Sequence, residues 1–197
     1  MSHYFSKQPT KKSHQKNISI VFNNIEYPFI TDYGVFSKDH LDEATSLLIH
    51  TVSLNEGETV LDLGCGYGVI GLLLADQFNV KATLCDVNER AIELANLNQK
   101  ALNIKAEIIC SDGYENIDQC FNHIITNPPI RVGKEKLYTL LKDAKKHLVP
   151  HGTLWFVMHK KHGVKSAITF LKDYYNLEVK KKHKGFHVVA CQNRLTR

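Results

Sequence analysis

The chain has 197 residues, of which 43% are hydrophobic and 23% charged, a length and composition typical of one well-buried soluble domain. No apolar run is long enough to span a membrane, and the amino terminus lacks the regions of a secretory signal, so we expect a cytoplasmic protein. The net charge of +5 is unevenly spread: residues 55–120 hold 4 basic and 11 acidic side chains, and residues 121–197 hold 16 and 4. The acidic part suits a cationic ligand and the basic part a polyanionic one, although a lysine run is often only a solvated face.

The first 16 residues are polar and basic, and we expect them to form a mobile arm ahead of a single domain at residues 17–197. Apolar runs at 18–22 and 25–30 flank Asn23 and Asn24, which tolerate positive φ, so this pattern predicts a short β-hairpin. A helix is predicted next, with Asp39 as its N-cap. Its apolar face consists of Leu41, Ala44, Leu47, Leu48 and Val52.

An apolar strand at residues 59–63 ends in three glycines at alternate positions, Gly64, Gly66 and Gly68, and an apolar helix follows directly. Because glycine adopts positive φ and lets a ligand approach the backbone, the pattern predicts a ligand at the start of that helix. The spacing Gly66-x-Gly68-x-x-Gly71 also satisfies the dinucleotide-binding fingerprint, and a merely tight turn is a further alternative. In the dinucleotide pattern, however, the strand end normally stays apolar, whereas Asp62 stands here.

The pattern Asp62-x-Gly64-x-Gly66-x-Gly68 resembles the first motif of the S-adenosylmethionine-dependent methyltransferases. The resemblance implies that Asp62 helps to hold the cationic methionine end of that cofactor. Asp86 closes the next predicted strand, 20 residues after Gly66, where a carboxylate beside the turn can accept from two ribose hydroxyls. Asp86 supports a nucleoside ligand without separating a methyltransferase from a dehydrogenase, and its alternative role is to cap the helix that begins near Asn88.

From residue 59 onward the pattern alternates between strands and helices. Strands are expected at 59–63, 81–86, 106–111, 122–127, 153–158, 176–181 and 186–192. Helices are expected at 68–78, 88–102, 113–118, 135–148 and 163–174. The alternation predicts an α/β, Rossmann-like, doubly wound fold: a mainly parallel seven-stranded sheet with helices on both faces and an N-terminal hairpin and helix extension. Ligands then bind at the carboxyl ends of the strands.

Two strand ends carry polar residues that fit such a ligand site. Asp112-Gly113 follows the third strand, where an acceptor for the adenine amino group lies in adenosine-binding members of this layout, although Asp-Gly is also ordinary turn chemistry. The fourth strand runs into Asn127-Pro128-Pro129, a stiff segment because each proline fixes φ and extends the residue before it. The Asn127 side-chain oxygen and the Pro128 carbonyl can both accept from one –NH₂ group and orient its lone pair for attack.

Metal binding is not expected. The five cysteines are an odd number without a C-x-x-C pair, and four of them lie in or beside predicted strands, as small core residues do. His159-x-x-His162 has a ligand spacing, but no second pair matches it.

The segment 62–68, Asp-Leu-Gly-Cys-Gly-Tyr-Gly, together with Asn127-Pro-Pro, resembles the class I amino-methyltransferases, whose targets are exocyclic base amines or the glutamine amide. Gly34-Val-Phe-Ser and Asn127-Pro-Pro-Ile-Arg-Val-Gly-Lys are similar to the branch of the ribosomal small-subunit guanine-N2 methyltransferase C, over roughly residues 30 to 192. In that family the catalytic half follows a degenerate copy of the domain. We find no such copy here and expect a single-domain member.

The resemblance implies S-adenosylmethionine as cofactor and ribosomal RNA or the small ribosomal subunit as partner, with no membrane and no metal. It implies catalytic roles for Asn127, Pro128, Pro129 and Ile130. It implies cofactor contacts from Gly34, Phe36, Asp62, Gly64, Cys65, Gly66, Gly68, Asp86, Val87, Asp112, Gly113 and Asn127. Candidate RNA contacts in the basic part are Arg131, Lys134, Lys180, Lys181, Lys182 and Lys184.

Ile130 departs from the DNA-adenine and glutamine branches, in which an aromatic residue at this position stacks on the target. The departure favours guanine N2 over adenine N6, cytosine N4 or a protein glutamine. It also leaves the stacking residue open, with Phe36 a candidate that fits a core role equally well. Two other classes remain: a non-catalytic RNA-binding or ribosome-assembly factor, and an NAD-dependent dehydrogenase, which leaves Asn127-Pro-Pro unexplained.

Overall fold

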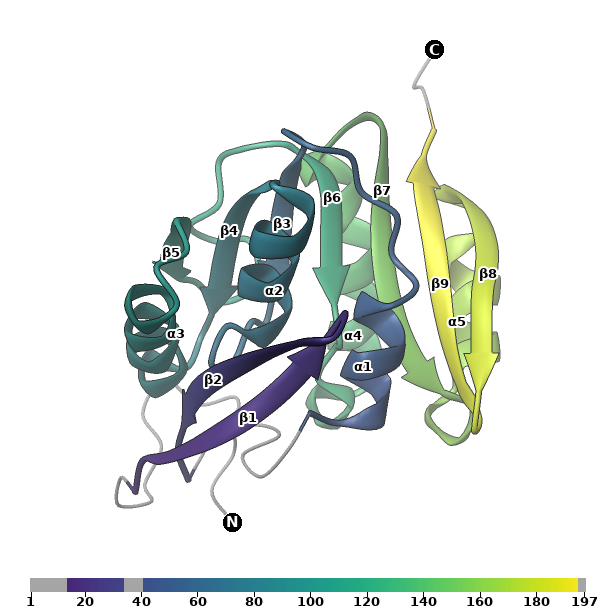
Figure 1. Cartoon of the computed structure of the whole chain (residues 1–197). Coiled ribbons are helices and arrows are strands. Elements are labelled where there is room, and N and C mark those ends of the chain that lie inside the picture. Colours follow the sequence, from purple (N-terminus) through teal and green to yellow (C-terminus); the bar gives the residue numbers. More distant parts are fainter. Residues whose placement is uncertain (1–13, 34–40, 195–197) are drawn as a thin grey trace.

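A seven-stranded sheet forms the centre of the structure, a computed structural model that describes residues 14–33 and 41–194 (Figure 1). The strand order is β5-β4-β3-β6-β7-β9-β8, in which β3 to β7 are parallel and β9 runs antiparallel to both of its neighbours. The strands are β3 (Thr59–Leu63), β4 (Lys81–Asp86), β5 (Ala106–Cys110), β6 (Phe121–Thr126), β7 (Leu148–His159), β8 (Tyr175–His183) and β9 (Phe186–Asn193). The predicted fold class is confirmed.

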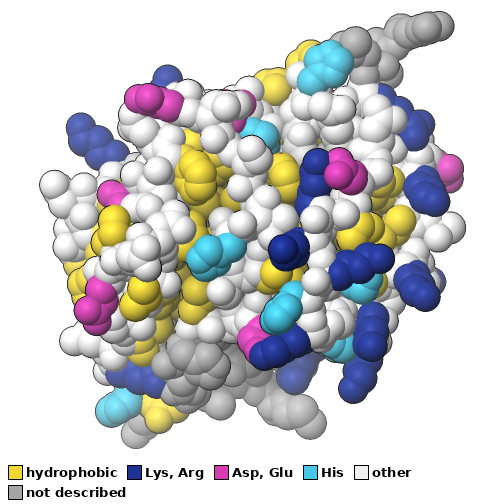
Figure 2. All heavy atoms as spheres, turned by 45° about the vertical axis from the view of Figure 1, so that its right-hand side comes forward, with side chains coloured by type: hydrophobic (Ala, Val, Ile, Leu, Met, Phe, Trp, Pro, Cys, Tyr) yellow, Lys and Arg dark blue, Asp and Glu magenta, His cyan; other side chains and the backbone are white. Residues whose placement is uncertain are grey.

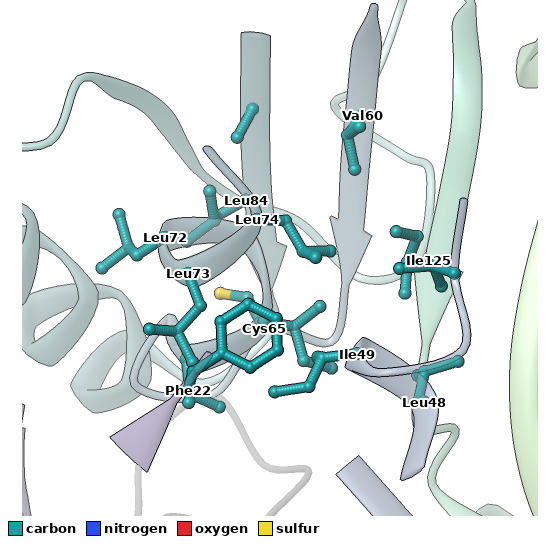
Figure 3. Packing of buried hydrophobic residues seen from close by; sticks show 14 of the residues in the cluster. Phe22, Leu48, Ile49, Val60, Cys65, Leu72, Leu73, Leu74, Leu84 and Ile125 are labelled. Carbon is teal, nitrogen blue, oxygen red and sulfur yellow. The ribbon is translucent and has the colours of Figure 1, made fainter. Parts of the chain in front are cut away.

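Helices cover both faces of this sheet. The helices α1 (Glu43–Ile49), α2 (Val69–Phe78) and α3 (Glu89–Ala101) lie in front of it in Figure 1, and α4 (Lys134–Asp143) and α5 (Val164–Leu171) lie behind it. Successive strand residues point to opposite faces, so Val60 and Ile125 enter the front core while Leu61 and Ile124 enter the rear core. Figure 3 shows how three consecutive leucines of α2, residues 72–74, fill the front core. None of the described helices is long and apolar enough to cross a bilayer.

The predicted N-terminal hairpin forms from β1 (Lys16–Phe22) and β2 (Ile25–Thr31). Asn23 and Asn24 both adopt positive φ, 48° and 63°, as a two-residue hairpin turn requires. The buried Asn98 of α3 fixes the hairpin to the domain, because its side chain accepts from Ile30 N (2.7 Å) and donates to Ile30 O (2.9 Å). The arm proposed for residues 1–16 lies almost wholly outside the described residues, which begin at 14.

One predicted helix is absent, and the ends of several other elements differ from those predicted. No helix forms at 113–118, because Ser111 Oγ accepts from Asn116 N (3.1 Å) and holds the segment as a turn. Asp39 lies outside the described residues, and the cap of α1 is Asp42, which accepts from Thr45 N (3.0 Å). The helix predicted at 135–148 ends at Asp143 and continues as a 3₁₀ turn, and β7 begins at residue 148 with an irregularity in its pairing to β6.

The half-buried His123 is expected to make stability depend on pH. Trp155 Nε1 donates to His123 Nδ1 (3.1 Å), so the other nitrogen, Nε2, carries the proton and donates to Glu58 (3.0 Å). Burial lowers the pKa of His123, an effect only partly offset by Glu58, so the unfolded chain takes up the proton more readily. The contribution of His123 to the free energy of unfolding should therefore fall as pH drops below about 6.5, the ordinary histidine value.

Urea unfolding of the parent and of His123→Gln, at about pH 7.5 and about pH 5.5, measures this effect. On acidification the parent should lose stability relative to the variant, because the variant lacks the titrating ring and the other titrating groups are common to both proteins. An equal change in both proteins would contradict the assignment.

Candidate active site

The predicted site residues meet at the carboxyl edge of the parallel strands, the lower edge in Figure 1. Asp62 lies near the end of β3, Asp86 ends β4 and Asn127 follows β6. Strand β6 lies beside β3, and Thr126 Oγ1 donates to Leu63 O (2.8 Å) from a fully buried position, which ties the two strand ends together. Residues predicted from three separate strands are therefore brought to one place.

The glycine turn after β3 is fixed by bonds to β4. The backbone N–H groups of Gly64 and Cys65 both donate to Cys85 O (2.9 Å each), and Gly66 N donates to Asp86 Oδ2 (2.9 Å). Gly64 and Gly66 adopt positive φ, and a Cβ placed on either would meet no atom within 4 Å. The turn therefore leaves open space on the side where a ligand is expected.

Gly68 and Gly71 serve packing instead. A Cβ on Gly71 would lie 2.6 Å from Leu84 Cδ1, and one on Gly68 would lie 3.1 Å from Leu72 and Leu84. Both glycines are buried, which lets α2 approach β4 closely. Of the glycines in the motif, the first two face the open space and the last two join the helix to the sheet.

Asp62 is fully buried beside this turn, and its two oxygens differ. Oδ2 accepts from Gly71 N (2.8 Å), whereas Oδ1 is buried without a hydrogen-bond partner among the described residues. Burial, together with the charge of Asp86, raises the pKa of Asp62 to about 7. A cationic group bound beside it would pair with the unsatisfied oxygen and lower this pKa.

Asp86 faces the glycine turn and does not cap α3. Its Oδ1 accepts from Asn88 N (2.9 Å) while its Oδ2 accepts from Gly66, and burial raises its pKa. Asn88 is the N-cap of α3, with its side chain accepting from Arg90 N (3.1 Å), so the alternative capping role for Asp86 is wrong. Val87, between Asp86 and Asn88 in the chain, is half-buried.

The first turn of α1 holds the Asn127 side chain. Its amide nitrogen donates to Thr45 Oγ1 (3.1 Å) and to Asp42 Oδ1 (3.3 Å). Pro128 is buried, and Ile130 begins a half-buried 3₁₀ turn, Ile130–Val132. Sequence reasoning missed Asp42 and Thr45 in this role, because the only local signal at Asp42 is that of a helix cap.

The remaining candidates lie at or near the same edge. Asp112 is exposed and forms an ion pair with Lys136 of α4 (3.4 Å), and Gly113 adopts positive φ. Arg131 and Lys134 are exposed in the segment that follows Asn127. Gly34 and Phe36 lie outside the described residues, so the structure does not place them.

The lysine run 180–184 occupies the end of β8 and the turn into β9. This turn lies close to α1, because Lys184 forms an ion pair with Glu43, the first residue of that helix. Lys180 pairs with Glu178. The basic turn therefore adjoins the helix end that holds Asn127.

An open hollow of about 830 Å³ lies elsewhere, at the amino edge of the sheet. It is lined by the starts of β4, β5 and β6, including Lys81, Ala106 and Phe121. None of the predicted site residues lines it.

A doubly wound sheet with an acidic, glycine-rich turn after its first parallel strand and Asn-Pro-Pro after its fourth defines a class I S-adenosylmethionine-dependent methyltransferase. The family described as "Methyltransferase small domain" matches residues 26–190, and the chain belongs to that family.

Relatives and solved structures agree with this membership. The chain is 40% identical over 196 residues to the uncharacterized protein YbxB of Bacillus subtilis. The match covers 96% of this chain and 98% of that protein. It is 39% identical over 129 residues to the ribosomal RNA small subunit methyltransferase C of Pasteurella multocida, but covers only 39% of its length. The fold is similar to that of the Thermus thermophilus 16S rRNA N2 G1207 methyltransferase, solved with AdoMet and guanosine: the TM-score is 0.82 at 24% identity, over 91% of this chain and 51% of the other.

Proposed function

We propose that this methyltransferase modifies an exocyclic amine of RNA, namely the N2 amine of a guanine in ribosomal RNA. The observation that carries the proposal is the fixed carboxamide of Asn127 after β6, the strand that pairs with β3 and hence neighbours the strand before the glycine turn. The partial likeness to ribosomal RNA small subunit methyltransferase C supports the choice of guanine N2. A ribosomal substrate also agrees with the expected cytoplasmic location.

The acidic part of the site is proposed to hold the cofactor. Bound there, S-adenosylmethionine supplies an electrophilic methyl group. The unpaired Asp62 oxygen attracts the cationic end of the cofactor. The open space at Gly64 and Gly66 accommodates the part of the cofactor that lies against the protein backbone. The half-exposed Asp86 accepts from the ribose hydroxyls. We propose further contacts from Gly34, Phe36, Cys65, Gly68, Val87, Asp112 and Gly113.

The Asn-Pro-Pro segment is proposed to orient the target amine. The Asn127 side-chain oxygen and the Pro128 carbonyl accept the two amine hydrogens, which turns the nitrogen lone pair away from its conjugated ring. These two dipoles also favour the positive charge that the nitrogen gains as it is methylated, and its proton then leaves to water. The aliphatic Ile130 packs against the base without a π face.

The deciding experiment identifies the methylated atom. The protein is incubated with labelled S-adenosylmethionine and with ribosomal RNA or small subunits from a strain lacking the gene, and the nucleosides are separated by mass spectrometry. Label in N2-methylguanosine is the expected result. Label in N6-methyladenosine or N4-methylcytidine would show that another base is the target. Label only in protein would overturn an RNA substrate, and RNA binding without any label would favour a non-catalytic assembly factor.

A basic surface is proposed to dock the RNA. Pairing of β7 with β9 brings a second run, His159-Lys160-Lys161-His162, beside the turn between β8 and β9, where Lys160 N donates to Gly185 O (2.8 Å). Figure 2, which brings the β8–β9 side forward, shows Lys and Arg side chains gathered there with few acidic ones. Among the described residues, no carboxylate pairs with Lys160, Lys161, Lys181 or Lys182, which leaves these four for phosphates.

Replacing Lys160, Lys161, Lys181 and Lys182 together by Gln should weaken RNA binding and flatten its salt dependence. Each lost phosphate contact lowers the slope of log K against log salt by about 1. Filter binding of a 16S ribosomal RNA transcript over a salt series measures it. A charge-matched control replaces the exposed Lys81, Lys100, Lys105 and Lys172, which lie toward the amino edge. Equal effects in both variants would show that only net charge matters.

A further inference from the structure

Asn127 is held by residues more than 80 positions earlier in the chain. Its amide nitrogen donates to Thr45 Oγ1 (3.1 Å) and to Asp42 Oδ1 (3.3 Å), and an amide nitrogen carries two hydrogens. Both hydrogens therefore have acceptors at the start of α1, one on its N-cap and one in its first turn. The carboxamide oxygen is left to face away from that helix.

The chemistry of Asp42 determines which end of the carboxamide faces α1. An ionised carboxylate only accepts hydrogen bonds, so a flipped Asn127 would set two acceptors against each other. The unflipped side chain avoids this clash. In the flipped state the target amine would instead meet a donor group and lose the acceptor that orients it.

The two partners of Asn127 are themselves held in place by burial and by a hydrogen bond. Thr45 is 2% exposed, and Asp42 Oδ1 also accepts from Thr45 N (3.0 Å) as the N-cap of α1. Leu48 and Ile49 of the same helix are buried in the front core, which anchors α1 to the sheet (Figure 3). A hydrogen bond to a charged acceptor also polarises the amide and makes its oxygen a better acceptor.

We propose that Asp42 and Thr45 are positioning residues for the methylation reaction: they lock the Asn127 carboxamide with its oxygen toward the target amine and strengthen that oxygen as an acceptor. The proposal rests on the amine-orienting role given to Asn127 under the proposed function. It assigns the first turn of α1 a part in turnover and none in holding the cofactor.

The test compares Thr45→Val, Asp42→Asn and the control Thr83→Val. Valine keeps the shape of threonine but accepts nothing, and Asn keeps the helix cap while removing the charge. We expect each of the first two to lower kcat about tenfold with an unchanged cofactor Kd. Thr83 is also buried and bonds Glu107 (3.2 Å), so its variant should lose stability without losing kcat.

A double-mutant cycle separates positioning from a general structural effect. In an Asn127→Ala background, measured by single turnover, Thr45→Val should lower the rate no further, because the side chain that it positions is gone. A tenfold loss that persists in that background would overturn the proposal, as would a full kcat in both Thr45→Val and Asp42→Asn. If Thr45→Val does not fold, Asp42→Asn carries the cycle.

A second readout needs no substrate. The Asn127 side-chain NH₂ signals in an NMR spectrum should shift and exchange faster with water in both variants, because their acceptors are lost or weakened. Unchanged signals would overturn the positioning role. A parent enzyme that methylates some other amine would refute guanine N2 alone, since both the cycle and the spectrum can still be recorded.

Discussion

Replacing Asn127 by Ala should lower kcat by ~10²–10³ and leave the Kd for S-adenosylmethionine nearly unchanged. The size is that found when one preorganised polar contact to a reacting group is removed. The selectivity follows from the structure, because Asn127 follows β6 and is held by α1, whereas the glycine turn and Asp86 belong to β3 and β4. Single-turnover rates at saturating cofactor, with calorimetric titration of the cofactor, measure the two quantities separately.

Asn122 provides the matched control. It lies at the opposite end of β6, and its Oδ1 accepts from both Thr59 N and Thr59 Oγ1 (2.9 Å each). Asn122→Ala removes the same functional group at the other end of β6, so it should cost stability but not kcat. Similar losses of kcat in both variants would mean that Asn127 acts through the fold, and a matching loss of cofactor affinity in Asn127→Ala would place it in the cofactor site.

Replacing Asp86 by Ala should weaken cofactor binding by ~10–10²-fold, the effect of losing a charged hydrogen-bond acceptor. The change also removes the carboxylate that accepts from Gly66 N and Asn88 N, so the glycine turn loses a support as well as a ligand contact. Asp76→Ala is a suitable control. Asp76 lies near the end of α2, far from the glycine turn, and its carboxylate accepts a hydrogen bond from Tyr27. An Asp86→Ala protein that binds S-adenosylmethionine like the parent would refute the ribose assignment.

A second pair of variants tests the same site through its backbone. Gly66→Val should also abolish tight binding, since the side chain would enter the open space beside the turn. Gly57→Val is its counterpart, because Gly57 likewise has positive φ and open surroundings but lies before β3. Both variants suffer backbone strain, so only a loss confined to Gly66→Val identifies a ligand position. Binding of NAD in place of S-adenosylmethionine would contradict the cofactor itself.

Local pattern was enough to predict most of the elements and the meeting of three candidate site residues at one edge of the sheet. Apolar periodicity located β3 and β4 to the residue, and polar residues at the ends of parallel strands must share one edge, which brought Asp62, Asp86 and Asn127 together. The wrong helix at 113–118 shows where this reasoning fails, since side-chain bonds by Ser111 and Asn116 compete with helical ones.

Contacts between distant segments were not predictable from pattern. The bond from Asn127 to Thr45 joins residues 82 positions apart, and no periodicity reports the side-chain direction at either end. Lys160 and Lys161 were missed for a related reason, because they join the basic surface only through the pairing of β7 with β9. Such contacts depend on how the elements pack against one another, and this packing cannot be read from the local pattern of a single sequence.

β3 and β6 lie side by side at the centre of the sheet, so the two sides of the candidate site come from different parts of the chain. Residues 59–112 build the side with the glycine turn, residues 121–194 build the side with Asn-Pro-Pro and the basic turn, and the two halves adjoin where β3 pairs with β6. Helix α1 precedes both but packs on β7 and β9, with the second half. Under the proposed function the cofactor contacts lie in the first half and the target contacts in the second, so a graft of a new target specificity would have to transfer α1 together with the second half.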